Sequence, residues 1–135
     1  MTSMVIRCDV RVRHLPGPDG PSTRFVVAMT DLVASRVATG LMNLLDGRVC
    51  TLTLLGHVQL HVSCGSRCCV AGQVLMPRRP AEYRVHLDQD AIYMASAMCQ
   101  AFACREESVD HLDIDLDNDD RIACDICFRS ERRDR

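Results

Sequence analysis

The sequence predicts an α+β domain in which two amphipathic helices cover one face of a mostly antiparallel sheet. Three observations indicate this class: several segments alternate apolar and polar residues, two segments repeat apolar residues at helical spacing, and clusters of turn residues separate them. The chain has 135 residues, 47% hydrophobic and 25% charged. We therefore expect one domain over residues 1–128 and a charged tail over residues 129–135.

The first half of the chain predicts a strand, a helix and two further strands. In residues 4–13 one face of the predicted strand is apolar and the other carries Val5 followed by four charged residues, and the loop at 14–22 holds three prolines and two glycines. A short apolar run, Phe25–Met29, leads into a helix with Thr30 as its N-cap and Asp46-Gly47 after its end. Residues 48–55 and 57–63 follow as two neighbouring strands, or as one long strand bent at Gly56.

The second half predicts a strand, a helix and a closing hairpin. After an irregular segment at 64–72 and a proline-flanked loop, Pro77–Pro80, the residues from Tyr83 to Leu87 alternate as in a strand. Asp88 is a candidate cap for a second helix, whose apolar stripe ends at Phe102. The strands 112–117 and 122–128 close the domain, which gives the order β-α-β-β-β-α-β-β.

Composition and charge exclude several function classes. All 16 basic residues are arginine, so lysine Schiff-base chemistry and the P-loop lysine are absent. The net charge of −2 gives no electrostatic footprint for direct nucleic-acid binding. No apolar run has the ~18 residues of a membrane span, and Arg7 and Asp9 interrupt any secretory leader. We expect a soluble intracellular protein with mostly reduced thiols among its nine cysteines.

One cluster has the composition of a zinc site. His57, His61, Cys64 and Cys68, with Cys69 beside them, are nitrogen and sulfur ligands of the kind that tetrahedral zinc takes. On a strand, however, residues four apart are separated by ~13 Å, which favours a solvated strand face. We expect no cofactor, and a zinc-binding regulatory protein built on residues 57–69 stays the alternative.

Two other motifs are weaker. Cys124 and Cys127 have the spacing of half a zinc ribbon, but on a strand Cys124 should point inward and Cys127 outward. The acidic run that starts at Asp113 imitates a calcium loop, yet Asn118 and Cys124 occupy the positions where glycine and glutamate are needed. No nucleophile motif or phosphate-binding glycine loop is present in the sequence, so we do not expect an enzyme.

Several segments together resemble the adenovirus early region 4 open reading frame 3 protein family. These are Ile6-Arg7-Cys8 at the first strand, and Met29 with the Leu/Val-rich helix after it. The segment from Tyr83 to Ala91 is similar to the family's Y-V-H-L-D-x-x-A. In the closing hairpin, Arg121-Ile122 and Asp125-Ile126-x-Phe128 are similar to R-V and D-L-x-F. The resemblance covers most of residues 4–128.

The resemblance implies a non-enzymatic viral early protein that self-associates into a scaffold in the host nucleus. Such a scaffold reorganises PML nuclear bodies and sequesters host proteins of the DNA-damage and antiviral responses, without direct contact with nucleic acid or membrane. The residues implied in self-association and partner binding are Cys104, Asp125, Ile126 and Phe128. Three departures stand out: Cys104 replaces an asparagine, arginines replace a leucine-rich tail, and residues 48–80 contain a long insertion.

Overall fold

The computed structural model describes residues 2–75, 81–106, 108 and 110–131. These residues form two helices and nine strands, which confirms the α+β class. The helices are α1 (Asp31–Leu45) and α2 (Gln89–Ala103). The strands before α2 are β1 (Ser3–Arg7), β2 (Asp9–Leu15), β3 (Ser22–Met29), β4 (Thr51–Leu55), β5 (Gln59–Cys64), β6 (Cys69–Val70) and β7 (Glu82–Leu87). The last two are β8 (His111–Asp115) and β9 (Ala123–Ser130).

The strands form two mixed sheets rather than one mostly antiparallel sheet. A five-stranded sheet has the order β1-β4-β5-β7-β6, and a four-stranded sheet has the order β2-β3-β9-β8. The pairs β1–β4, β3–β9 and β5–β7 are parallel. Each helix carries the chain from one sheet to the other, so strands distant in sequence become neighbours. Alternation within a strand contains no information about which partner it will meet.

The first predicted strand is divided between the two sheets. Its alternation is correct, since Ile6 and Val10 are fully buried while Arg7 and Arg11 are exposed. At Cys8 the chain leaves β4, with which β1 pairs, and continues as β2 alongside β3. The bend at Cys8 leaves the alternation of buried and exposed side chains unbroken, so the sequence pattern does not reveal it.

The apolar run at 25–29 is part of β3, a strand that the sequence did not predict. β3 lies between β2 and β9, and five of its eight residues are buried. A central strand covered on both faces reads as a continuous apolar run and not as an alternation. Among the described residues, the predicted irregular segment at 64–72 also contains the two-residue strand β6.

Both predicted helix caps are confirmed. The Thr30 hydroxyl accepts from the N–H of Val33, and the Asp88 carboxylate accepts from the N–H of Ala91 at 2.8 Å. These side chains satisfy amide groups that have no partner inside the first turn of a helix. α1 ends at Leu45 before Gly47, whose φ of 72° lies in the left-handed region that favours glycine.

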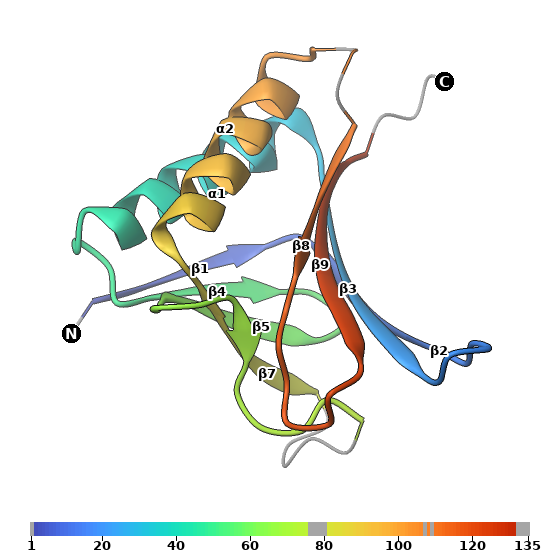
Figure 1. Cartoon of the computed structure of the whole chain (residues 1–135). Coiled ribbons are helices and arrows are strands. Elements are labelled where there is room, and N and C mark those ends of the chain that lie inside the picture. The colour runs from blue at the N-terminus through green and yellow to red at the C-terminus, as the bar shows by residue number, and fades with distance from the viewer. Residues whose placement is uncertain (1, 76–80, 107, 109, 132–135) are drawn as a thin grey trace.

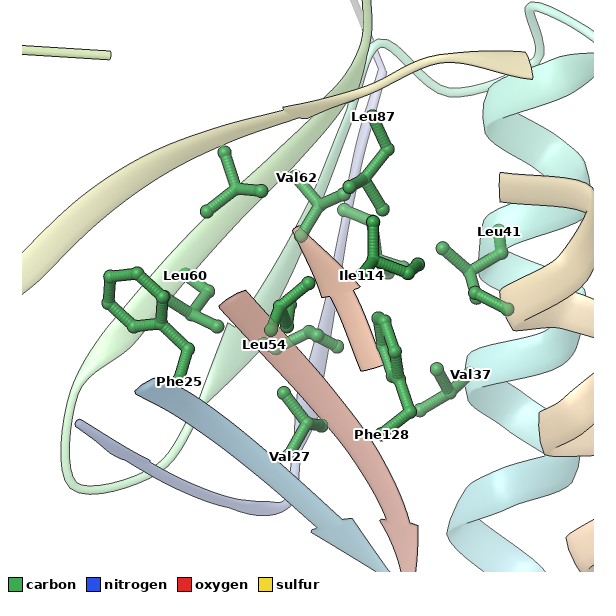
Figure 2. Close-up of a cluster of buried hydrophobic side chains, with 14 of the residues drawn as sticks. Phe25, Val27, Val37, Leu41, Leu54, Leu60, Val62, Leu87, Ile114 and Phe128 are labelled. Carbon is green, nitrogen blue, oxygen red and sulfur yellow. The ribbon is translucent and has the colours of Figure 1, made fainter. Parts of the chain in front are cut away.

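The core lies between the two sheets and the helices. Figure 1 shows the helix pair in the angle between the sheets, where α1 contacts strands of both and α2 contacts β8 and β9. In Figure 2, side chains from both sheets and from α1 point toward one another around Leu54, Ile114 and Phe128. Phe25 also meets Tyr83 edge-to-face, with ring centroids 4.8 Å apart, and so joins the two sheets.

Backbone hydrogen bonds join the sheets at two corners. At one corner, the N–H of His57 donates to the carbonyl of Val10 at 2.9 Å; at the other, the N–H of Val70 donates to the carbonyl of Asp117 at 2.8 Å. Gly56, in the turn between β4 and β5, permits the first contact. A Cβ at this position would meet the backbone nitrogen of Val10 and lie 2.6 Å from the carbonyl oxygen of Cys8.

Two predicted segments lie wholly or partly outside the described residues. Of the loop Pro77–Pro80 nothing is described. β9 runs to Ser130, two residues beyond the predicted end of the domain, and the N–H of Glu131 donates to the carbonyl of Met29. Residues 129 and 130 therefore belong to the sheet, and residues 132–135 are not described.

Candidate protein-binding surface

The two helices pack side by side and antiparallel. The Arg105 guanidinium, just after α2, pairs at 2.8 Å with the carboxylate of Asp31 at the start of α1. Near the middle of both helices, the buried hydroxyl of Ser96 donates to the carbonyl of Ala38 at 3.0 Å. The small residues at this crossing let the helix backbones come close, and a groove remains on the solvent side.

This helix-pair groove is uncharged. It has a volume of about 380 Å³, and its lining residues are Ala38, Thr39, Met42, Asn43, Tyr93, Ser96, Ala97 and Gln100. Small side chains form much of it, whereas Tyr93 is 64% exposed and Met42 36% exposed. Met94, the neighbour of Tyr93 on α2, is 52% exposed.

Such a surface is unusual for a helix that faces water. The solvent side of a surface helix normally carries charged residues, yet Asp90 is the one charged residue among the fifteen of α2. Protein–protein interfaces have the opposite bias, since their centres are depleted of charge and enriched in tyrosine and methionine. Tyrosine combines a large apolar area with a hydroxyl, and methionine adapts to irregular partners. The groove therefore has the chemistry of a protein-binding site.

The residues implied in self-association by the resemblance do not form one surface. Cys104 is exposed at the C-cap of α2. Asp125 lies on the outer face of β9, where its carboxylate accepts two hydrogen bonds from Arg24, at 3.0 and 2.9 Å. Ile126 and Phe128 have no exposed surface and belong to the core of the chain itself. Any effect of these two on association would act through the stability of the fold.

The candidate zinc ligands are likewise apart. In His61, one ring nitrogen lies 2.9 Å from the Thr53 hydroxyl and the other 2.6 Å from the Glu82 carboxylate, so both are engaged. His57 lies in the exposed turn before β5, and Cys64 is exposed at the end of β5. Cys68 is half-buried, and burial raises the pKa of its thiol. Within the described part of the chain, no group of three or more His, Cys, Asp or Glu residues is arranged to hold a metal.

Besides Cys68, four of the nine cysteines have thiols whose pKa is raised, and for these four the rise is large. Burial raises the pKa of Cys8 to about 11 and those of Cys99, Cys124 and Cys127 to about 12. A hydrogen bond to Asp113 contributes at Cys127. Because the thiolate is the nucleophilic form, these thiols are unreactive near neutral pH. All nine cysteines are free of disulfides.

Cys127 differs from the sequence prediction in its exposure. It lies on the outer phase of β9, opposite to Cys124 as predicted, but it is only 3% exposed. Its register neighbours are Val26 on β3 and Asp113 on β8, so it occupies an inner strand with covered flanks. A side chain on the outer face of a strand is exposed to solvent only where the side chains of the neighbouring strands do not cover it.

The helix-pair groove was not among the predicted sites. The apolar stripe of α2 predicts which face of the helix is buried, whereas the groove depends on the composition of the opposite face. The signal was available, because Tyr93, Met94 and Ala97 occupy positions where charged residues would be ordinary. The antiparallel contact with α1, which supplies Thr39 and Met42, needed the tertiary structure.

In the described residues, neither helix is long and apolar enough to cross a membrane. Comparison with known proteins found no matching family model, no matching curated protein and no matching solved structure.

Proposed function

We propose that this chain is a non-enzymatic interaction protein that forms a homodimer through the helix-pair groove. The observation that carries the proposal is the uncharged surface around Tyr93 and Met42, which leaves apolar area in water on two neighbouring helices. Burial of apolar surface is the main driving force of protein association, at roughly 25 cal/mol per Å².

A second copy of the chain fits this surface because the surface holds both a projection and a hollow. Tyr93 projects, with 64% of its surface exposed, beside a groove lined by the small residues Ala38, Ser96 and Ala97. In a contact with two-fold symmetry the same patch meets itself, so each tyrosine would enter the groove of the other copy. The absence of charge in the lining means that no ion is desolvated without a partner.

One observation supports a non-enzymatic role. The thiols of Cys8, Cys99, Cys124 and Cys127 have raised pKa values, which disfavours their use as nucleophiles. The His61 ring joins three strands of one sheet through Thr53 and Glu82, and these contacts stabilise the outer face of the sheet.

The biological setting is proposed from the sequence resemblance. A homodimer of this kind would serve as the unit of a viral early scaffold in the host nucleus. That scaffold would reorganise PML nuclear bodies and sequester host proteins of the DNA-damage and antiviral responses. The surfaces that dimerisation leaves open would then contact host nuclear proteins.

The test places a charge in the groove. Tyr93→Glu and Met42→Glu should each weaken the dimer at least about tenfold, because an unpaired carboxylate would be buried in an apolar contact. Val5→Glu is the matched control, since Val5 is 54% exposed on β1 and does not line the helix-pair groove. Light scattering after size exclusion in high salt gives the mass, and circular dichroism verifies the fold.

An outcome that contradicts the proposal is a wild-type chain that stays monomeric at every concentration. A dimer that both groove variants leave intact would also exclude the helix-pair groove as its interface.

A further inference from the structure

The four-stranded sheet ends in β2 and β8, whose outer sides meet the other sheet only at one end of each edge in the described residues: Val10 on β2 accepts from the N–H groups of His57 and Val58, and Asp117, just after β8, is bridged to Cys69 of β6. Just after β8, the backbone N–H of Leu116 donates to the carbonyl of Cys124. The backbone groups of even-numbered residues in this segment therefore point toward β9, and those of the odd-numbered residues His111, Asp113 and Asp115 point away from it. On β2, the carbonyl of Val10 points away from β3, toward His57, and the backbone groups of residues 12 and 14 share this direction. Such edges can pair with a strand of another chain.

The outer face of this sheet carries a row of four charged residues, one from each strand. In register across the sheet, Arg13 lies opposite Arg24, Arg24 opposite Asp125, and Asp125 opposite Asp115. The central pair is a bidentate ion pair. The two outer pairs join like charges, Arg13 with Arg24 and Asp125 with Asp115, and like charges directly opposite each other destabilise a sheet.

The next row repeats this polarity. It contains Arg11 on β2, Val26 on β3, Cys127 on β9 and Asp113 on β8. Both rows therefore have arginine at the β2 edge and aspartate at the β8 edge, with the four side chains exposed. In these two rows the face presents opposite charges at the two edges, and in the row beyond them Asp9 lies at the β2 edge, where its carboxylate is 2.9 Å from the Arg11 guanidinium.

We propose that the β2 edge of one copy pairs with the β8 edge of a second copy, which continues the four-stranded sheet from chain to chain. In this contact Arg13 of one copy lies beside Asp115 of the next, and Arg11 lies in the same way near Asp113. The Arg13–Arg24 pair then has the carboxylate of a neighbouring Asp115 beside it, and the Asp125–Asp115 pair has the guanidinium of a neighbouring Arg13. Within the chain, Arg24 and Asp125 already neutralise each other in this way.

The contact is head-to-tail, since two different surfaces meet. Head-to-tail contacts close into rings or continue as filaments, according to the rotation between copies. This mode is separate from the helix-pair groove, so it adds a second direction of assembly to the proposed dimer. It also depends on ionic strength, because the screening length falls from about 10 Å at 0.1 M to about 3 Å at 1 M salt.

The experiment uses charge reversal in complementary pairs. One variant carries Arg11→Glu and Arg13→Glu, and the other carries Asp113→Arg and Asp115→Arg. Each variant alone presents like charges at both edges, so head-to-tail association should weaken at least about tenfold at low salt. In an equimolar mixture every contact between the two variants joins opposite charges, and the assemblies should return.

Within a single chain the substitutions at positions 13 and 115 have the opposite effect on stability. Arg13→Glu places a carboxylate opposite Arg24, and Asp115→Arg places a guanidinium opposite Asp125, so each replaces a like-charged neighbour by an opposite one. Arg11→Glu instead breaks the 2.9 Å ion pair with Asp9, and Asp113→Arg removes a hydrogen bond to Cys127. We therefore expect the single variants Arg13→Glu and Asp115→Arg to equal or exceed the wild type in melting temperature, and circular dichroism verifies that the double variants stay folded. A general loss of folding would lower the melting temperature and association together. Arg84→Glu, at an exposed position on β7 of the other sheet, controls for a charge reversal placed away from the two edges.

Sedimentation velocity at low and high salt is the measurement. Support requires wild-type assemblies that dissociate as salt rises, their loss in each variant, their return in the mixture and their persistence in Arg84→Glu. The proposal is overturned if either variant assembles like the wild type, if the mixture stays dissociated, or if the wild type shows no assembly larger than a dimer at low salt. Tyr93→Glu distinguishes the two proposals, since it removes the groove dimer and leaves the edge contact unchanged.

Discussion

Replacing Phe128 by alanine tests whether this residue acts in the core or in association. Phe128 lies on the inner phase of β9 and has no exposed surface. In Figure 2 its ring lies among side chains from the other strands of its sheet, from the opposite sheet and from α1, including Val27, Ile114 and Val37. All three layers of the fold would border the cavity that alanine leaves.

The expected loss of stability is large. Truncation of a buried phenylalanine to alanine costs about 3–5 kcal/mol, since the transfer free energy of the ring is lost and the cavity collapses only in part. A small domain has a total stability of about 5–15 kcal/mol, so this loss is a substantial fraction of the whole. The upper part of the range applies here, because a site bordered by two sheets and a helix cannot close by moving one element.

Urea unfolding followed by circular dichroism measures the effect. The midpoint should fall while the slope stays near the wild-type value, because the surface exposed on unfolding is nearly the same. Tyr93→Ala is the matched control: it removes an aromatic ring that is 64% exposed and should change stability by no more than about 0.5 kcal/mol. Wild-type stability for Phe128→Ala, with weakened self-association, would refute the core assignment.

Further predictions concern a close backbone contact, a helix cap, alkaline pH and metal. Gly56→Ala should destabilise the fold by about 3 kcal/mol, because the new Cβ meets backbone atoms of Cys8 and Val10 that cannot rotate away; unchanged urea stability would contradict this. Asp88→Ala removes the acceptor for the N–H of Ala91 and should cost about 1 kcal/mol, while Asp88→Asn should retain most of the stability in thermal melts. Stability should decline as pH rises above 9, since the unfolded chain releases the proton of Cys99 near its ordinary pKa of 9.0 and the folded chain keeps it until about 12. This residue contributes about 1.4 kcal/mol per pH unit in that window, and Cys99→Ala should reduce the slope; an identical slope would show that other groups cause the decline. Chelation followed by dialysis should leave the melting temperature unchanged, whereas one tightly bound zinc per chain, with unfolding on its removal, would favour the zinc-binding alternative.

The sequence by itself determined the local elements of this protein. Thr30 and Asp88 cap the helices at the predicted positions, because a cap is a contact between residues three apart. The inner phases of β5, β7 and β9 are also as predicted, because alternate residues of a strand point to the same face and this period of two is visible in the sequence. These features depend on neighbours along the chain.

Only the tertiary structure decided which distant segments meet. The division of residues 3–15 between two sheets and the central position of β3 follow from pairings with strands far along the chain. The same pairings place Ile126 and Phe128 in the core, and they align Arg13, Arg24, Asp125 and Asp115 in one row. Periodicity shows that a face is buried or exposed, but it does not name the strand or helix beside it. The candidate surfaces of this protein, the helix-pair groove and the charged sheet edges, are made by such neighbours and therefore required the fold.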